Sequence, residues 1–167
     1  MKHIKLFVLA IFISLLLWTC WSEKDIHLYM IGDSTMANKP LLENPERGWG
    51  QVFPEFFKDN VKIHNHARNG RSTKSFLDQG LWQAVLDSLK PGDYVMIQFG
   101  HNDQKISDST RYTAPRTGYR TNLIRYVTES REKGASPILL TPVMRRRFDK
   151  DGKFYDAHGE YPDVVRE

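Results

Sequence analysis

The sequence predicts an α/β protein with a mostly parallel sheet. Short apolar segments alternate along the chain with stretches of helical periodicity. One of them, residues 94–99, is a near-continuous apolar run, which is typical of a strand buried on both faces of its sheet. Alternation of strand and helix is usual in domains whose parallel sheet is covered by helices. With 40% hydrophobic residues in a chain of 167, one domain can bury a core.

The expected strands are residues 26–31, 61–67, 94–99 and 137–141. The first ends at Gly32 and the third at Gly100. The second alternates apolar and polar residues with the period of a strand, and places His64 and His66 on one face. A metal pair is possible there, but no further ligand lies at a supporting distance, and a site needs three or four donors. Packed or surface histidines are therefore the favoured interpretation, and we expect no metal and no other cofactor.

Helical segments separate these strands. The first opens at Gly48-Trp49-Gly50 and carries an aromatic stripe with Val52, expected to pack against the sheet, made of Trp49, Phe53, Phe56 and Phe57. The second runs from Leu81 to residues 90–92. The third spans residues 117–133, with Leu123, Tyr126 and Val127 facing inward. Ser72 can cap a helix, and residues 162–166 are expected to begin another. The expected loops are residues 38–47, 108–116 and 149–161.

The N-terminal segment predicts export. Two lysines precede an apolar run at residues 6–18, and charge returns at Glu23. This pattern fits a signal peptide or lipoprotein signal at residues 1–22 better than a membrane-spanning helix. Cys20, the one cysteine of the chain, lies where a lipid-modified cysteine would be; otherwise it is removed with the signal. We expect a periplasmic, extracellular or lipid-anchored protein whose single domain is residues 23–167, with no other contact with a membrane.

The charge balance argues against nucleic acid as a partner. From residue 23 onward, 22 Lys and Arg stand against 20 Asp and Glu, a balance of +2, which is too even for a nucleic-acid surface. The one local excess is Arg145-Arg146-Arg147, followed by Asp149 and Asp151. A solvated turn is the favoured interpretation of this run, and a patch for an acidic polymer is the alternative.

Residues that could take part in a reaction directly follow the ends of the expected strands. Gly32-Asp33-Ser34 follows the first strand, Asn69-Gly70 the second and Gly100-His101-Asn102-Asp103 the third. The site of a parallel α/β sheet lies beyond the carboxyl ends of its strands. A serine hydroxyl there can act as a nucleophile, while the N–H groups of Ser34 and Gly70 and the amide of Asn102 can stabilise an oxyanion. The alternative is that residues 33–35 only cap a helix.

These motifs, in this order, resemble the SGNH (GDSL-type) hydrolase superfamily. Further segments are similar to its rhamnogalacturonan acetylesterase branch: Gly48-Trp49-Gly50-Gln51, residues 69–73, 100–103, 132–135 and 137–143. The resemblance extends from the first strand to the last residue. It implies a three-layer α/β/α, flavodoxin-like fold and a metal-free serine esterase that removes acetyl groups from plant cell-wall polysaccharide, pectin first.

The resemblance also implies roles for individual residues. Ser34 is the expected nucleophile, and its N–H, the N–H of Gly70 and the side chain of Asn102 form the expected oxyanion hole. We expect contacts with the substrate from Asp33, Arg71 and His158. The expected partner is an acetylated polysaccharide or oligosaccharide, and we expect the protein to be a monomer.

The general base is where the sequence departs from the superfamily. A serine hydroxyl needs a proton acceptor, usually a histidine oriented by a carboxylate, and this superfamily takes both from a late Asp–His motif after a fifth strand. Nothing here matches that motif: Asp156-x-His158 is similar, but it lies in a loop before a helix. His101 is expected to be structural, with its ring bonded to nearby backbone. We therefore expect an incomplete domain, with little or no turnover from these residues alone.

Two groups of alternatives stay open. Among enzymes, the same scaffold serves other specificities, such as a xylan acetylesterase or a small-ester hydrolase. From a different class, the chain could be a non-catalytic, surface-attached glycan-binding protein that kept the pocket and lacks the base.

Overall fold

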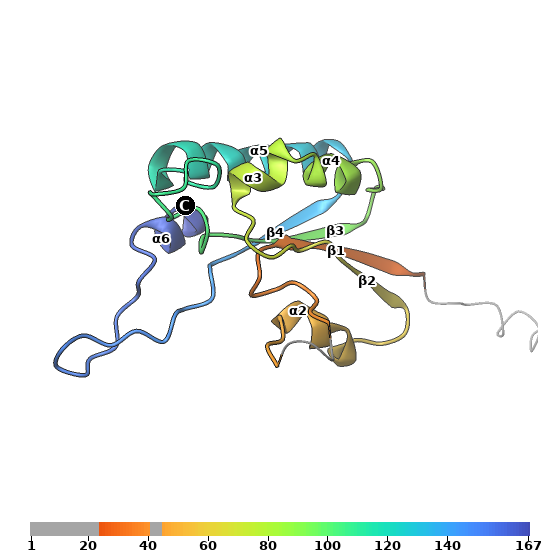
Figure 1. Cartoon of the computed structure of the whole chain (residues 1–167). Coiled ribbons are helices and arrows are strands. Elements are labelled where there is room, and N and C mark those ends of the chain that lie inside the picture. The colour runs from red at the N-terminus through yellow and green to blue at the C-terminus, as the bar shows by residue number, and fades with distance from the viewer. Residues whose placement is uncertain (1–23, 41–44) are drawn as a thin grey trace, which may run out of the picture.

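The computed structural model describes residues 24–40 and 45–167 (Figure 1), so the expected signal at residues 1–22 lies outside the described residues. Its strands are β1 (Ile26–Gly32), β2 (Val61–Asn65), β3 (Tyr94–Gln98) and β4 (Ser136–Leu140). Its α-helices are α2 (Trp49–Val52), α3 (Thr73–Asp78), α4 (Leu81–Leu86), α5 (Arg120–Glu132) and α6 (Tyr161–Arg166). Two short helical turns adjoin them, the 3-10 helix η1 (Phe53–Phe56) and the π-helix η2 (Pro115–Tyr119).

The strands form one parallel sheet in the order β2-β1-β3-β4. In β1, Ile26 is opposite Val61 of β2, and Gly32 is opposite Gln98 of β3. The parallel α/β sheet predicted from the sequence is confirmed. Because every strand points the same way, the segments that follow β1, β2, β3 and β4 all emerge at one edge, which we call the carboxyl edge.

Helices cover both faces of the sheet, but unequally. Figure 1 shows α3, α4 and α5 over one face and the short α2 on the other. The first face holds the larger buried cluster, which includes Ile31, Phe76, Trp82, Val95, Ile97, Phe99, Tyr119 and Tyr126. The second face holds a smaller one, made of Leu28, Met30, Met36, Ala37 and Ala67. The three-layer α/β/α arrangement is thus confirmed, with one thick and one thin helical layer.

The predicted aromatic stripe after Gly48 is only partly right. Trp49 and Phe53 pack against the smaller cluster, but Phe56 is 79% exposed. The reason is Pro54, which occupies one of the first positions of η1, so that α2 ends at Val52. A 3-10 helix has three residues per turn and not 3.6. The change of period turns the later rings away from the sheet.

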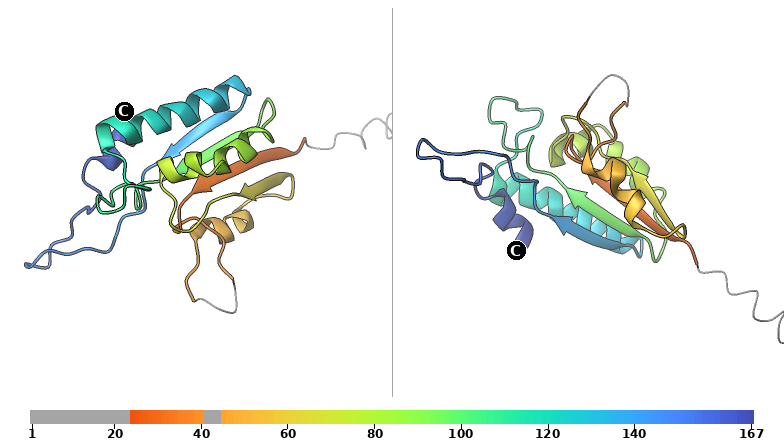
Figure 2. Two further views of the ribbon diagram at one scale, coloured as in Figure 1. Left: turned by 45° about the horizontal axis from the view of Figure 1, so that its top comes forward. Right: turned by 90° about the horizontal axis from the view of Figure 1, so that it is seen from below.

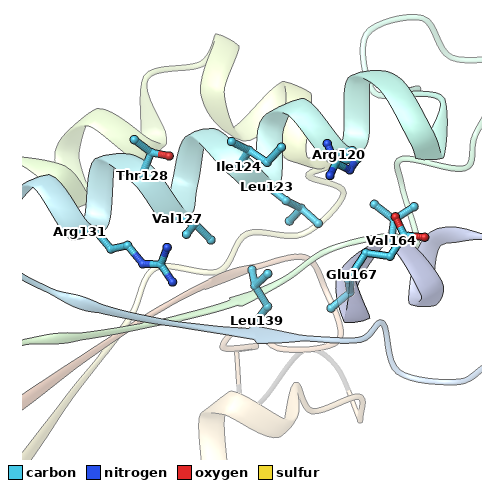
Figure 3. Close-up of a pocket in the computed structure, with 10 residues that line it drawn as sticks. Arg120, Leu123, Ile124, Val127, Thr128, Arg131, Leu139, Val164 and Glu167 are labelled. Atoms are coloured by element: carbon cyan, nitrogen blue, oxygen red, sulfur yellow. The ribbon is translucent and has the colours of Figure 1, made fainter.

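Helix α5 presents the inward face that its sequence predicts. Leu123 and Tyr126 are buried, and Val127 is half-buried. Val127 lines an apolar groove of about 270 Å³ together with Leu139 of β4 and Val164 of α6 (Figure 3). Of the helices in the described part of the chain, none combines the length and apolarity that crossing a membrane requires.

Gly48 allows α2 to approach the backbone that follows β1. A Cβ on this buried residue would lie 2.1 Å from the carbonyl oxygen of Ala37.

We predict that Gly48→Ala lowers the free energy of unfolding by about 3 kcal/mol, the upper part of the range for overpacking, because the atoms in contact belong to backbone. Urea unfolding measures this loss. The matched control is Gly152→Ala, where a Cβ meets open space and φ is +74°, so only about 1 kcal/mol of backbone strain is expected. Equal losses in the two variants would contradict the prediction.

Candidate active site

Ser34 lies in a tight turn directly after β1. Asp33, which precedes it, is only 1% exposed. Its Oδ1 accepts hydrogen bonds from the N–H (2.9 Å) and the hydroxyl (2.8 Å) of Thr35. Residues 34–40 form turns and irregular backbone, so the alternative that Ser34 belongs to a helix cap is wrong. Asp33 is therefore buried in the turn that carries Ser34, which argues against the substrate contact expected of it.

Gln98, the last residue of β3, connects this turn to its neighbours. Its Oε1 accepts a hydrogen bond from Trp49 Nε1 (2.8 Å), and its Nε2 donates to the carbonyl of Thr141 (2.9 Å). The backbone N–H of Trp49 donates in turn to the carbonyl of Thr35 (2.8 Å). One buried amide therefore joins the Ser34 turn, α2 and the segment after β4. The sequence analysis did not single out Gln98, because no local pattern marks a polar residue at a strand end as a bridge.

Gly70 and Asn102 reach the same edge as Ser34. The N–H of Arg68 donates to the carbonyl of the last residue of β1 (3.0 Å), so the segment before Gly70 runs beside the Ser34 turn. Asn102, 3% exposed, donates from Nδ2 to the carbonyl of Arg71 (2.9 Å). Gly70 has φ of +76°, a conformation that favours glycine.

The expected oxyanion-hole donors have N–H groups that form no hydrogen bond with the described residues. Within residues 24–40 and 45–167, neither the N–H of Ser34 nor that of Gly70 donates a hydrogen bond. Asn102 uses Nδ2 in one bond, and an amide NH₂ group has two hydrogens. An oxyanion hole requires preorganised donors of this kind, aimed at the place where charge develops.

Three depressions surround this part of the carboxyl edge. One, of about 620 Å³, is lined by Ser34, Lys39, Trp49 and Val143 among others. The other two, of about 350 and 480 Å³, share Asn69 and Arg71. Arg71 thus lines two depressions next to Gly70, a position compatible with the substrate contact predicted for it. Lys39, which the sequence analysis missed, is 6% exposed and holds its amino group 2.7 Å from Asn69 Oδ1.

Asp103 is a buried carboxyl group next to Asn102. It accepts hydrogen bonds from the N–H of Thr73 (3.0 Å) and the hydroxyl of Thr113 (2.8 Å). Thr73 is the first residue of α3, and Ser72 caps that helix as predicted, in a reciprocal pair with Ser75. Burial raises the pKa of Asp103 to about 6, although these hydrogen bonds act in the opposite direction.

His101 is a half-buried ring whose Nδ1 is buried and has no hydrogen bond among the described residues. Its Nδ1 lies 3.8 Å from Asp33 Oδ2, too far for a hydrogen bond, and neither atom has another partner among the described residues. The prediction that the ring bonds to nearby backbone is therefore wrong. The backbone carbonyl of His101 is used instead, and accepts from Arg145 Nη2 (3.2 Å). Burial lowers the pKa of His101 to about 4, so the ring is neutral at pH 7.

His158 packs against His101 and forms an Asp–His pair. The two rings meet edge to face with centroids 4.6 Å apart, and His158 Nδ1 lies 2.9 Å from Asp156 Oδ1. His158 is 1% exposed, so this structure covers the ring that was expected to contact substrate. Its Nε2 has no partner among the described residues. In the same part of the chain, no histidine is hydrogen-bonded to Ser34.

The strand histidines are packed, as predicted. His64 Nε2 lies 2.9 Å from His27 Nδ1, and the His64 and His66 rings stack on Tyr29 with centroids 4.6 and 5.9 Å away. No group of three or more His, Cys, Asp or Glu in residues 24–40 and 45–167 could hold a metal ion.

A parallel α/β sheet whose first strand leads into a serine turn, with free donors at the same edge, defines a serine hydrolase scaffold. The chain belongs to the GDSL-like lipase/acylhydrolase family, which matches residues 30–167. This confirms the predicted superfamily.

Individual relatives agree with the predicted branch. The chain is 44% identical over 144 residues to rhamnogalacturonan acetylesterase RhgT of Bacillus subtilis, covering 86% of this chain and 60% of that protein. It is 39% identical over 135 residues to the probable rhamnogalacturonan acetylesterase YesY of the same organism, covering 81% and 61%. The chain thus spans about 60% of the length of these relatives.

Solved structures share the fold. Protein YxiM of Bacillus subtilis superposes with a TM-score of 0.74 at 28% identity, covering 86% of this chain and 40% of that one. An acetyl xylan esterase from Geobacillus stearothermophilus superposes with a TM-score of 0.56 at 18% identity, covering 84% and 70%.

The buried Asp103 predicts a pH dependence of stability. Its pKa in the folded protein, about 6, lies above its ordinary value of 3.8, so folding favours the protonated form. The stability that protonated Asp103 contributes is fully present below pH 3.8. It is lost as the pH rises from 3.8 through 6, and the free energy of unfolding falls by up to about 3 kcal/mol. Asp103→Asn cannot ionise, and we expect it to remove this loss, as measured by urea unfolding between pH 4 and 7. Exposed Asp151→Asn is the control; if Asp103→Asn keeps the wild-type slope, the interpretation is wrong.

Proposed function

We propose that this protein is a serine esterase that removes acetyl groups from pectic polysaccharide, with rhamnogalacturonan as its substrate. The observation that carries the proposal is the set of free donors at the carboxyl edge, where the Ser34 turn also lies. The substrate is supported by the names of the relatives, two of which are rhamnogalacturonan acetylesterases of Bacillus subtilis and Emericella nidulans.

The proposed reaction is acyl transfer through Ser34. The hydroxyl oxygen attacks the acetyl carbonyl and gives up its proton to a base. The carbonyl oxygen becomes an oxyanion, which accepts hydrogen bonds from the N–H groups of Ser34 and Gly70 and from the amide of Asn102. The carbon–oxygen bond to the sugar then breaks, the sugar oxygen takes up a proton, and acetyl-Ser34 remains. Water attacks this ester, releasing acetate and restoring the hydroxyl.

Basic side chains around the depressions suit an acidic substrate. Lys39 lines the depression that contains Ser34, Arg68 and Arg71 line the second, and Arg111 lines the third beside Gly70. A pectic main chain carries uronate carboxylates, and guanidinium groups bind carboxylates with two parallel hydrogen bonds. Lys39 lies 3.9 Å from Glu46, and Arg111 is paired with Asp108, so Arg68 and Arg71 are the cations that support this preference. Xylan has a neutral main chain, so these two arginines favour the pectic substrate over the xylan alternative.

The proposal predicts the effects of two substitutions in the full-length protein. Ser34→Ala should reduce acetate release from acetylated rhamnogalacturonan to background, because the nucleophile is lost. Asn102→Ala should lower kcat by about two to three orders of magnitude, as loss of an oxyanion donor does, with KM little changed. Release of acetate is measured with acetylated xylan as the comparison substrate. A change below about threefold for Asn102→Ala would contradict its assignment, and binding of the polymer without release would favour the glycan-binding alternative.

A fluorophosphonate probe addresses the expected lack of a base in residues 1–167. We expect no labelling of Ser34 in this chain, since no histidine in its described part is bonded to the Ser34 hydroxyl. Labelling would overturn that expectation, and its loss in His158→Gln would assign the base to His158.

We also propose that the protein acts outside the cytoplasm, anchored or released after its N-terminal segment is processed. The basic start and apolar run support this, as does a relative named as an uncharacterized lipoprotein of Bacillus subtilis, 25% identical over the whole chain. If Cys20 carries lipid, Cys20→Ser should move the protein from the membrane fraction to the soluble exported fraction. Cytoplasmic retention of the unprocessed wild type would contradict export.

A further inference from the structure

The segment between β4 and α6 forms a projecting arm, residues 142–160. Figures 1 and 2 show it extending from the carboxyl edge away from the sheet and its helices. Its outer half is an antiparallel hairpin: Phe148 pairs with Phe154, and the N–H of Tyr155 donates to the carbonyl of Arg147 (3.2 Å). At the tip, the carboxylate of Asp149 accepts from the N–H groups of Asp151 and Lys153, both at 2.9 Å. The outer half of the arm therefore has defined backbone contacts, while Arg146 and Arg147 are exposed to solvent, as the interpretation from the sequence expects.

Both ends of the arm are attached to the candidate active site. Val143 lines the depression that contains Ser34, and Arg145 donates to the carbonyl of His101 (3.2 Å), next to Asn102. At the other end, His158 packs against the His101 ring. A polymer whose acetyl group reaches Ser34 thus has the arm beside it as it leaves the depression.

The arm exposes large apolar side chains that a free loop would not need. The exposed fractions are 51% for Met144, 52% for Phe148, 43% for Phe154 and 46% for Tyr155. Phe148 and Phe154 contact each other with centroids 5.9 Å apart, so the rings gather on the hairpin. Contiguous apolar groups on a surface, bordered by polar residues, mark an interaction site.

The arm also carries a small excess of positive charge, one more cation than acids. Its cations are Arg145, Arg146, Arg147, Lys150 and Lys153, and its acids are Asp149, Asp151, Asp156 and Glu160. Asp156 is already paired with His158, and Glu160 with Arg116. Among the described residues, Arg146 and Arg147 have no carboxylate within 4.0 Å, and both are exposed. The hairpin therefore offers free guanidinium groups next to exposed rings.

This combination matches the chemistry of an acidic polysaccharide. A uronate polymer alternates carboxylates, which bind guanidinium groups, with the apolar C–H faces of sugar rings, which can lie against aromatic side chains. We propose that the arm is a binding subsite for a uronate main chain, which it holds beside the depression of Ser34. This inference deepens the proposed function, but binding to the arm does not require the esterase reaction.

The test is binding of the 167-residue chain to polygalacturonate, which carries no acetyl groups, by affinity electrophoresis and calorimetry. The double variant Arg146→Gln/Arg147→Gln should bind about tenfold or more weakly, the loss of at least about 1.4 kcal/mol, and wild-type binding should weaken with salt. Arg120→Gln/Arg131→Gln on α5 removes the same charge from exposed positions outside the arm and should bind within about twofold of the wild type. Phe148→Ser should weaken binding without a change in net charge. Circular dichroism verifies that each variant is folded.

Several outcomes would overturn the proposal. They are equal losses in the two arginine double variants, unchanged binding in Arg146→Gln/Arg147→Gln, and equal affinity of the wild type for polygalacturonate and neutral xylan. Binding to anionic phospholipid vesicles but not to polygalacturonate would assign the arm to a membrane surface instead. Because the ligand has no acetyl group, binding that depends on the arm can be found even if the esterase proposal fails. Esterase activity can likewise be found even if the arm does not bind the polymer.

Discussion

The carboxyl edge of this sheet depends on one buried carboxyl group, that of Asp103. Its side chain accepts from the start of α3 at Thr73 and from the loop at Thr113. Its carbonyl lies 3.0 Å from the hydroxyl of Tyr161 at the start of α6. Loops at the end of a parallel sheet have no ladder partners, so their buried polar groups must be satisfied by side chains. Asp103 does this for three segments at once and thereby holds Asn102, its neighbour in the chain, against the segment that contains Gly70.

The Ser34 turn depends on a second constraint, close approach of backbones. Gly48 and Gly50 bring α2 so near to residues 36 and 37 that a Cβ on either would lie within 2.5 Å of a carbonyl oxygen. This contact lets Trp49 reach both the Thr35 carbonyl and the Gln98 amide. The Ser34 turn is thus supported by close neighbours on the thin side of the sheet, while the thick helical layer supplies most of the core. Preorganisation of this kind is what acyl transfer requires of its donors.

The arm extends the carboxyl edge beyond the depression that contains Ser34. Ser34 lies in the depression that Val143 borders, and the arm continues from Val143 to exposed aromatic and arginine side chains. A site for a small ester would need only the depression. An extended basic and aromatic surface joined to it suits a polymer, so the structural features that support the proposed substrate lie largely outside the residues that would carry out the chemistry.

From the sequence alone, the strands and the parallel sheet could be predicted, because apolar periodicity identifies strands. The placement of Ser34, Gly70 and Asn102 at one edge follows from the sheet, because parallel strands end at the same edge. The packing of Phe56 against the sheet was predicted wrongly, since a local pattern does not show that Pro54 changes the helical period. The hydrogen bond from the His101 ring to backbone was also predicted wrongly, since a local pattern does not show which atom of a loop residue forms a hydrogen bond. Gln98, Lys39 and the exposed aromatic side chains of the arm were not foreseen. Their roles depend on partners far away in the chain, such as Trp49 and Thr141 for Gln98. Hydrogen bonds between residues so far apart in the chain produce no periodic pattern in the sequence. Only the tertiary structure decides which of them form.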